Sequence, residues 1–391
     1  MTKEVTDAVE ALADKWRGER DDRLQRRHLD SADFAALADT GFGRLIVPVE
    51  QGGFWTTLDE SGPVIVEAIR TLARGDQSVA LVASMHPGIV TFWTAAAEAP
   101  EPYRAAWAEQ RVEVFDSVLE GHFWGTITSE PGSGGDIMST RATAEPVDGE
   151  PGRHRLRGQK HFGSGSGVLS YMITTACPDG LDHPLGFYLD LRHQTWDGTS
   201  GLKITHPWDG MGMKATQSHA VMLEGVEATA FAWPGSIAEA APYAAALGLP
   251  MFCAVIVSIV DEAMAEAERR LAARELRAHD EIEWARAQVE HWMLTQAIDG
   301  LVRTLATQRV EAVAADAVKA KLAIADLAEA LVGRICRVVG GGAFSARSPF
   351  ASWYEDVRAL GYLRPPWALA YDQLIEARRS GTGAGFGIES P

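Results

Sequence analysis

Two stretches of sequence indicate the fold of this chain most clearly. They are Thr126–Asp136, TITSEPGSGGD, and Lys160–Gly165, KHFGSG. The first is a β-type run leading into a turn rich in proline and glycine. The second is a β-type run that carries an aromatic ring and a hydroxyl. Glycines let backbone N–H groups approach an anionic group closely, so the turn can meet a pyrophosphate while the second strand lies along a flat ring, which suits a flavin. The residues alone leave open an ordinary turn at Pro131 and a plain strand with Phe162 turned inward.

The composition of the chain argues against several classes of protein. It has 391 residues, of which 46% are hydrophobic and 23% charged, as in ordinary globular proteins. The net charge is −17 and no segment gathers Lys and Arg among aromatic residues, so nucleic acid is not an expected partner. The three cysteines, Cys177, Cys253 and Cys336, form no disulfide framework and favour a reduced, cytoplasmic setting. No cluster of His, Cys and Asp has the spacing of metal ligands, and no metal is expected.

Membrane insertion is not expected either. The N-terminal residues contain no apolar run of the kind found in a signal peptide. The most apolar stretch, Leu247–Val260, is interrupted by Pro250 and followed by Asp261. It is shorter than the ~20 residues that span a bilayer, and we interpret it as a buried helix.

The order of predicted elements divides the chain into three domains. Residues 1–118 show helical spacing, residues 119–235 contain short β-type runs between Gly, Pro and Asp, and residues 236–391 are Ala-rich and helical, with breaks at Gly and Pro. The expected helices are Val5–Trp16, Ser31–Thr40 with Ser31 as its N-cap, Thr57–Leu72, Gln77–Ala97, Glu262–Arg274, Ile282–Thr307, Val310–Val339 and Pro349–Leu360. The expected strands are Phe123–Thr128, His154–Leu156, Tyr171–Thr175, Leu185–Leu191 and Ala220–Leu223. The Gly-rich tail from Gly381 is expected to be loose or to make contacts.

Five stretches together carry a family resemblance that covers nearly the full length. They are GFGRLIVPVEQGG (41–53), ITSEPGSGGD (127–136), LRGQKHFGSGSG (156–167), GMGMKATQSHAV (210–221) and VVGGGAFSARSPFASWYEDVRA (338–359). With these motifs the chain resembles the acyl-CoA dehydrogenase superfamily. The resemblance implies an α+β multidomain fold with an N-terminal helical domain, a middle β-barrel and a C-terminal four-helix bundle. It further implies a flavin between barrel and bundle, usually in a homotetramer, with a homodimer as the alternative.

The resemblance also indicates which residues contact the flavin. By position, the contacts are Thr126, Thr128, Ser129, Gly134, Gly135, Phe162, Ser164, Arg274, Gly340 and Gly341. The family often has a serine where Gly135 stands, so a hydroxyl contact is lost there. The family's Arg-x-x-Phe-Gly stretch, which reaches a neighbouring chain's FAD, corresponds here to Arg274–Asp280, which keeps arginines but not Phe-Gly. FAD is therefore held differently, or the flavin is FMN or FADH2 supplied in reduced form by a separate reductase.

Two departures from the family pattern indicate the kind of reaction. The form Phe162–Gly165 resembles the flavin monooxygenase branch, in which the serine, here Ser164, hydrogen-bonds near flavin N5. The catalytic glutamate of many dehydrogenases would fall in Leu360–Trp367, which contains no carboxylate. Arg364 stands about where that base would be, and an arginine is no base near neutral pH. Arg364 would either bind an anionic substrate or pair with an acid. Some relatives move the base to the first bundle helix, where Glu239 is a crude candidate.

A histidine in the second long helix is the remaining candidate for acid–base chemistry. His86 lies in an apolar helical run, and relatives in the monooxygenase branch often use a histidine from this helix. The alternative is a core histidine whose nitrogens are satisfied by hydrogen bonds. His122 and His161 are weaker candidates, because neither has a clear inward direction.

The sequence therefore predicts a monooxygenase that uses reduced flavin and O2 on a small-molecule substrate. Ser164 and His86 would stabilise or protonate the oxygen adduct of the flavin, and Arg364 would bind substrate. The cofactor is FAD, or FMN supplied reduced by a flavin reductase. The alternatives are an FAD-dependent acyl-CoA dehydrogenase or oxidase with Glu239 as base, and a catalytically silent partner subunit of such an enzyme.

Overall fold

The computed structural model describes residues 2–181 and 183–379, and the predicted tail from Gly381 lies outside this range. The helices are α1 (Thr2–Gly18), α2 (Arg20–Arg23), α3 (Ser31–Asp39), α4 (Leu58–Gly75), α5 (Gln77–Ala95), α6 (Arg104–Leu119), α7 (Ser236–Leu271), α8 (Ala278–Thr307), α9 (Val310–Val339), α10 (Pro349–Val357), α11 (Ala359–Tyr362) and α12 (Trp367–Arg379). The strands are β1 (Trp124–Thr126), β2 (Thr143–Pro146), β3 (Arg153–Gly163), β4 (Tyr171–Pro178), β5 (Leu185–Asp190), β6 (Leu202–His206) and β7 (His219–Ala230). Short 3-10 turns are η1 (Phe42–Ile46), η2 (Val49–Gln51), η3 (Ile137–Ser139) and η4 (Gly341–Phe344).

The strands form a small closed barrel between two helical regions. The barrel is closed by β4, β2, β3, β7 and β5, which pair in that order and return to β4, while β1 adds to β4 and β6 to β7. The register between β3 and β7 shifts between Lys160 and Gly163. Such bulges re-aim side chains and are common beside active sites. The α+β class and the barrel are confirmed, while the domain boundaries after residues 118 and 235 stay predictions.

The N-terminal helices α1, α3, α4 and α5 start within a few residues of the predicted positions, whereas α2 and α6 are not among the expected helices. Asp76 accepts hydrogen bonds from the N–H groups of Ser78 and Val79, which starts α5 directly after α4. The predicted N-cap of α3 is wrong by one residue. Asp30, rather than Ser31, is the cap, because its carboxylate accepts the N–H of Ala32.

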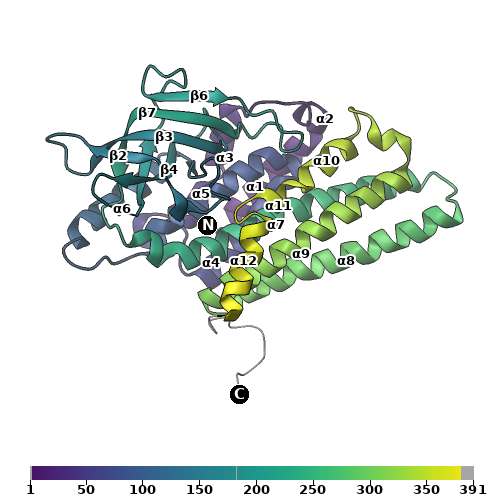
Figure 1. Ribbon diagram of the computed structural model, residues 1–391. Helices are drawn as coiled ribbons and strands as arrows, with labels where there is room; N and C mark the ends of the chain where they lie inside the picture. The colour runs from purple at the N-terminus through teal and green to yellow at the C-terminus, as the bar shows by residue number, and fades with distance from the viewer. Residues whose placement is uncertain (1, 182, 380–391) are drawn as a thin grey trace.

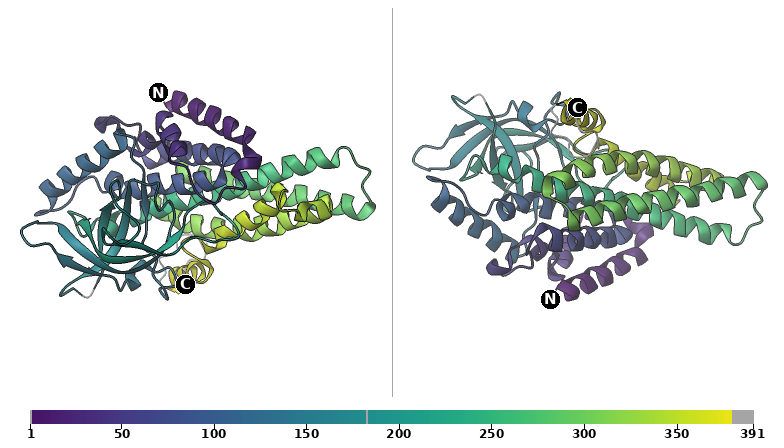
Figure 2. Two further views of the ribbon diagram at one scale, coloured as in Figure 1. Left: turned by 90° about the horizontal axis from the view of Figure 1, so that it is seen from above. Right: turned by 90° about the horizontal axis from the view of Figure 1, so that it is seen from below.

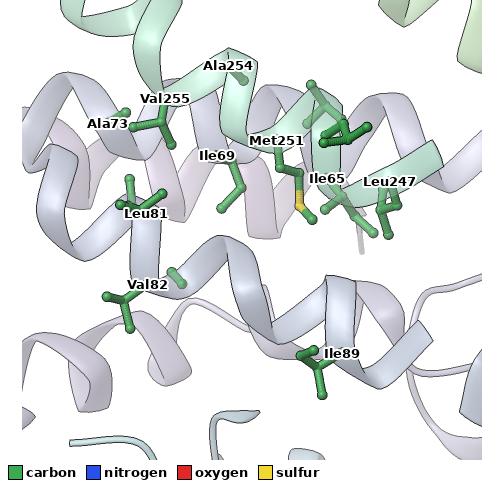
Figure 3. Packing of buried hydrophobic residues seen from close by; sticks show 14 of the residues in the cluster. Ile65, Ile69, Ala73, Leu81, Val82, Ile89, Leu247, Met251, Ala254 and Val255 are labelled. Atoms are coloured by element: carbon green, nitrogen blue, oxygen red, sulfur yellow. The ribbon is translucent and has the colours of Figure 1, made fainter. Parts of the chain in front are cut away.

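Helix α7 corrects the prediction that proline breaks the segment after Ser236. It runs unbroken for 36 residues with Pro242 and Pro250 inside it. An interior proline costs a helix about 3 kcal/mol, and burial of the surrounding apolar side chains against α4, α5 and α9 offsets that cost. Figure 3 shows this packing, in which side chains of the three helices α4, α5 and α7 face one another. They are Ile65, Ile69, Ala73, Leu81, Val82, Ile89, Leu247, Met251, Ala254 and Val255.

Among residues 2–181 and 183–379, two helices, α5 and α7, are long and apolar enough to cross a membrane by length and composition alone. The statement that the apolar stretch around Pro250 is too short is therefore corrected, because that stretch belongs to the longer helix α7. Its prediction as a buried helix is confirmed. Inside the fold, 78% of the apolar window of α5 and 72% of that of α7 is buried, as in the core helices of globular proteins.

The barrel and the far end of the bundle lie at opposite ends of the molecule. Figure 2 shows the barrel at one end, the N-terminal helices along one side, and the bundle extending away from both. The connection between α7 and α8 and the turn after α9 both lie at the far end of the bundle (Figure 1). The segment between α11 and α12 instead lies toward the barrel, which places Arg364 beside the strands.

Candidate functional site

Three segments that are far apart in sequence meet at Ser129. The hydroxyl of Ser129 accepts a hydrogen bond of 2.7 Å from Nη2 of Arg364, which follows α11. The carbonyl of Ser129 accepts the N–H of His161 at 2.8 Å, which ties the start of the turn to the end of β3. Ser129, a predicted flavin contact, and Arg364, which stands about where the missing base would be, are thus neighbours in the fold.

A buried ion pair holds the turn after Ser129 in place. Nζ of Lys160 lies 2.7 Å from Oε1 of Glu130, and the lysine is completely buried. The carboxylate of Glu130 also accepts the N–H groups of Arg141 and Ala142. Burial alone would raise the pKa of Glu130, but the bond from Lys160 and these two amides outweigh it and lower that pKa. Sequence reasoning missed this pair, although both residues lie inside the quoted motifs.

Two glycines of the turn, Gly134 and Gly135, have positive φ angles but different surroundings. Gly134 adopts φ 61°, and a Cβ built on it would meet no atom within 4 Å, so its backbone faces open space. Gly135 adopts φ 88°, and its Cβ would lie 2.8 Å from Cδ of Pro366. The serine that relatives often carry at this position would therefore collide with the segment that follows Arg364. The loss of that hydroxyl accompanies a tight contact between the turn and the Arg364 segment.

Phe162 is held out from the barrel in a strained conformation. Its φ is 58°, which is an outlier for a bulky residue, and it lies at the bulge of β3. The side chain is 61% exposed, with its ring edge-to-face with His161 and Trp208 at centroid distances of 6.0 and 6.3 Å. Strain of this kind gathers at functional sites. The buried-strand alternative for Phe162 is wrong, and an exposed aromatic face is available for a flat ring.

Ser164 begins a chain of buried hydroxyls. Its Oγ lies 2.8 Å from Oγ of Ser218, which lies 2.7 Å from Oγ1 of Thr216. Thr216 donates to the carbonyl of Met213 at 2.9 Å, so Ser218 donates to Thr216 and Ser164 donates to Ser218. In this arrangement the hydroxyl of Ser164 is free to accept a hydrogen bond. If all three hydroxyls reverse the direction of their hydrogen bonds, the hydroxyl of Ser164 becomes a donor. The carbonyl of Met213 then still accepts from the indole N–H of Trp208.

The segment that ends this chain is anchored from α10. Asp356, which is buried, accepts hydrogen bonds from the N–H of Met213 and the side-chain amide of Gln77. Burial raises the pKa of Asp356 to about 6. The sequence analysis does not identify Thr216 and Ser218 as site residues. The available signal was the spacing of two hydroxyls in the motif GMGMKATQSHAV.

The loop that carries Arg364 is held from beneath by a buried lysine. Nζ of Lys321 on α9 donates to the carbonyl of Leu363 at 2.9 Å and to the carbonyl of Pro365. Both bonds flank Arg364 directly. Lys321 is completely buried, and burial lowers its pKa to about 8. Sequence reasoning missed Lys321, because nothing on α9 marks which of its residues faces this loop.

The guanidinium of Arg364 lacks a direct counter-charge in the described part of the chain. Within residues 2–181 and 183–379 its one hydrogen bond is that to Ser129, and it forms no ion pair. Burial lowers its pKa to about 10, against a weak opposing effect of Asp136. The carboxylate of Asp136 accepts the N–H of Met138 and the hydroxyl of Ser139, and it forms no ion pair with Arg364 among the described residues. The prediction that Arg364 pairs with an acid therefore finds no support among the described residues.

His86 has the surroundings of a core histidine. It is buried against Phe123, its Nδ1 accepts the N–H of Trp124 at 3.1 Å, and its Nε2 donates to the carbonyl of Gly43 at 3.2 Å. Burial lowers its pKa to about 4. The ring is therefore neutral near pH 7 with both nitrogens engaged, which leaves none for proton transfer. The geometry corresponds to the alternative that the sequence left open, a satisfied core histidine.

The remaining predicted cofactor contacts lie apart from this group. Arg274 follows α7 and donates from Nη1 to the carbonyl of Val339 at 3.0 Å. Gly340 and Gly341 follow Val339, so all of these residues lie at the far end of the bundle (Figure 1). Within one chain the predicted contacts thus form two separate groups, one at the barrel and one at the bundle tip. Glu239, the candidate base for a dehydrogenase, is exposed on the first turn of α7.

A hollow on the outside of the barrel is distinct from this site. Its volume is ≈ 600 Å³, and its lining includes Arg153, Asp190, His193, Glu224 and Glu227. No residue predicted from the sequence to bind cofactor or substrate lines it. The chemistry-bearing groups meet instead at Ser129, where the turn, the end of β3 and the Arg364 segment converge.

Comparisons with known proteins give a consistent result. The chain is 26% identical over 254 residues to the amino sugar nitrososynthase DnmZ of Streptomyces peucetius, covering 59% of this chain and 60% of that protein. It is 24% identical over 217 residues to a dibenzothiophene monooxygenase of Rhodococcus qingshengii, covering 55% and 48%. The crystal structure of FMN-bound TdsC from Paenibacillus sp. A11-2 has the same fold, with a TM-score of 0.79 and 18% identity over 96% of this chain and 97% of that one.

These likenesses confirm the family resemblance that the sequence motifs indicated. The chain spans about half to three fifths of the length of the curated relatives it matches. No protein-family model matches the chain. The shared fold with TdsC extends over nearly all of both chains and establishes the architecture around the site.

Proposed function

We propose that this chain, a member of the flavin monooxygenase branch of the acyl-CoA dehydrogenase superfamily, transfers an oxygen atom from O2 to a small organic molecule. The observation that carries the proposal is the contact between Arg364 and Ser129. By the family resemblance, Arg364 stands about where a dehydrogenase needs a carboxylate, and a guanidinium is not a base. Glu130 offers no substitute, because its carboxylate is engaged by Lys160 and two amides. The names of the curated relatives, a nitrososynthase and a monooxygenase, support the same reaction class.

A flavin fits the group of residues at Ser129. Phe162 offers an exposed aromatic face, Gly134 leaves open space at the turn, and the hydroxyls of Thr126 and Thr128 lie 3.5 Å apart beside it. We propose FMN in preference to FAD, because TdsC of the same fold is FMN-bound and the Phe-Gly pair of the FAD-binding stretch is absent here. Reduced flavin, delivered by a separate reductase, would supply the electrons for activating O2.

The residues of this chain would orient the flavin and control one hydrogen bond. The hydroxyl of Ser164 would face the ring and act as acceptor or donor according to the direction of the chain through Ser218 and Thr216. Such a preorganised group can stabilise developing charge without reorganisation. His86 has no part in this scheme, because its two nitrogens are bound to Gly43 and Trp124.

We propose that two or more copies of the chain assemble. The outer surface of α8 exposes four apolar residues, Ile282, Val289, Trp292 and Met293, each more than two fifths exposed. The second group of predicted cofactor contacts, around Arg274, lies at the far end of the bundle from the barrel of its own chain. In an assembly of identical chains this group can meet the flavin held by the barrel of a neighbour. Self-association would give these residues the role that the family resemblance implies.

The test mixes anaerobic protein, loaded with photoreduced FMN, with oxygenated buffer and follows flavin absorbance by stopped flow. The proposal predicts reoxidation at least tenfold slower than for free reduced FMN, with 18O from 18O2 transferred to a substrate. Ser164→Ala and Ser218→Ala should each change the reoxidation rate by about tenfold, since one hydrogen bond is worth about 1.4 kcal/mol. Ser166→Ala, a buried serine of the same segment whose hydroxyl donates to Gly163, is the matched control.

Two results would contradict the proposed function. One is reoxidation as fast as that of free flavin in the wild-type protein. The other is a tightly held oxidised FAD that is bleached by an acyl-CoA, which would return the chain to the dehydrogenases or oxidases. Solution mass, measured by light scattering on the same sample, tests the assembly separately.

A further inference from the structure

We propose that the substrate of this site is an organic anion, and that Arg364 binds its negatively charged group. The inference rests on the proposed function, because it names the substrate class of the same site. It starts from the guanidinium of Arg364, which carries a positive charge near neutral pH and has five N–H donors. Within the described ranges, 2–181 and 183–379, one of these donors is used, by Ser129.

The charges around Arg364 leave it without direct compensation. Two other cations near the turn are paired with Glu130, since Lys160 lies 2.7 Å and Arg141 3.9 Å from its carboxylate. Asp136 is the acid whose charge acts on Arg364, but the two form no ion pair among the described residues. The carboxylate of Asp136 accepts from Met138 and Ser139 instead. An uncompensated charge is costly to bury, so a site that keeps one gains by binding the opposite charge. A carboxylate or a sulfur oxyacid can accept two parallel N–H bonds from a guanidinium.

The position of Arg364 is fixed rather than incidental. Lys321 holds the carbonyls of Leu363 and Pro365 on either side of it. Pro366 packs against Gly135, which binds the loop to the turn. A side chain anchored on both sides of its backbone, with its head group on Ser129, is preorganised for a ligand. Nothing in the fold of the described residues requires a cation at this point.

Two sources could provide the anion, namely the substrate and the phosphate of FMN. We infer the substrate, because Arg364 stands about where the family resemblance expects a substrate-directed base, and its head group is bonded to Ser129, which in turn accepts the N–H of His161. The phosphate source makes a different prediction. If Arg364 bound the phosphate, its removal would weaken FMN but leave riboflavin, which has no phosphate, unchanged.

The experiment is isothermal titration of the protein loaded with oxidised FMN, using matched pairs of anionic and neutral probes. The pairs are benzoate with benzamide and acetate with acetamide. The wild-type protein should bind the anion of at least one pair tenfold or more tightly than its neutral partner. Arg364→Met should lose at least tenfold in anion affinity and change amide affinity by less than twofold. Arg364→Lys, which keeps the charge but not the fork of donors, should fall between them.

Controls separate the local effect from net charge and from the cofactor. Arg309→Met removes a cation with a side chain 88% exposed and should leave all four affinities unchanged. FMN and riboflavin affinities of Arg364→Met should equal those of the wild type. A variant that loses FMN but keeps riboflavin would overturn the inference, since the guanidinium would then serve the cofactor phosphate.

Two further results would overturn it. One is a wild-type protein that shows no preference for the anion of either pair. This measurement does not depend on whether a variant folds. The other is Arg364→Met with unchanged anion affinity. Because the titrations involve no turnover, a negative outcome leaves the proposed oxygen transfer untouched. Conversely, failure of oxygen transfer leaves these binding constants unchanged, so the two failures are distinguishable.

Discussion

Two cations, Lys160 and Arg364, lie beside the same turn, and their surroundings differ in one respect. Lys160 is completely buried and bonded to Glu130 and to the carbonyl of Thr175. Arg364 is largely covered, bonded to one serine hydroxyl, and free of any ion pair within residues 2–181 and 183–379. The charge of Lys160 is compensated by the carboxylate of Glu130. The charge of Arg364 has no such partner among the described residues, and most of its N–H donors are unused there.

This difference distinguishes a residue that stabilises the fold from a residue that binds a ligand. Removing one partner of a buried ion pair strongly destabilises the protein, because the other charge is then left buried without a partner. A buried charge with no partner destabilises the ligand-free protein, and binding of an opposite charge removes that destabilisation. Lys160 therefore belongs to the scaffold of the turn, and Arg364 to the ligand. Three predictions test this distinction through the free energy of unfolding, and they are given in order of decreasing effect.

Lys160→Met should have the largest effect on stability. It leaves the buried carboxylate of Glu130 with the amides of Arg141 and Ala142 and with the exposed guanidinium of Arg141 at 3.9 Å. We expect a loss of about 3–5 kcal/mol in the free energy of unfolding. Urea denaturation measures it. The double variant Lys160→Met, Glu130→Gln removes both charges and should recover a large part of the loss. A single variant that loses less than about 1 kcal/mol would break the comparison.

His86 adds a third buried group to the comparison, one that stays neutral. Its pKa is about 4 in the folded protein, below the ordinary value of 6.5. Between these values the unfolded chain binds a proton that the folded chain does not, so acid favours unfolding. As the pH falls from 6.5 to 4, the free energy of unfolding should therefore decrease by about 3 kcal/mol from this residue.

The measurement compares urea denaturation of the wild type and His86→Gln at pH 7, 5.5 and 4.5. The wild type should lose more stability than the variant over this range, because glutamine does not titrate. Equal losses in both proteins would show that His86 is charged in the fold. That result would reopen its role as an acid or base.

Arg364→Met should have the smallest effect on stability. The variant loses one hydrogen bond to Ser129 and gains by removing an uncompensated charge, so the free energy of unfolding should change by less than about 1 kcal/mol. Thermal and urea denaturation at pH 7, without ligand, give the value. A loss as large as that of Lys160→Met would place Arg364 in the scaffold and remove the contrast on which the anion site rests.

Much of the fold follows from local patterns in the sequence. The order of helices and strands, the turn at Gly134 and the limits of α9 depend on apolar periodicity and on glycine and proline, which act over a few residues. The same local rules failed at Pro250. There the burial of α7 against three other helices outweighs the break that a proline usually causes.

The candidate site was predictable in part. Phe162, Ser164 and Ser129 stand in motifs that are recognisable along the chain. The bond between Ser129 and Arg364 is consistent with the expectation that the stretch around Arg364 lies at the same site. Lys321 stands in no motif and is joined to Pro365 across 44 positions. Its role could not be read from α9, since every buried position of an amphipathic helix looks alike until its neighbours are known.

Local conformations and the types of functional group at the site follow from the order of the residues alone. They include a glycine where φ is positive, a serine and an aromatic ring on one strand, and an arginine where relatives carry a base. Which of the charges form ion pairs follows only from the three-dimensional arrangement. Glu130 neutralises Lys160 at a separation of 30 residues, whereas Arg364 reaches across 235 residues to a neutral serine. Charge compensation depends on distance in space and on burial, and neither is written in the order of the residues.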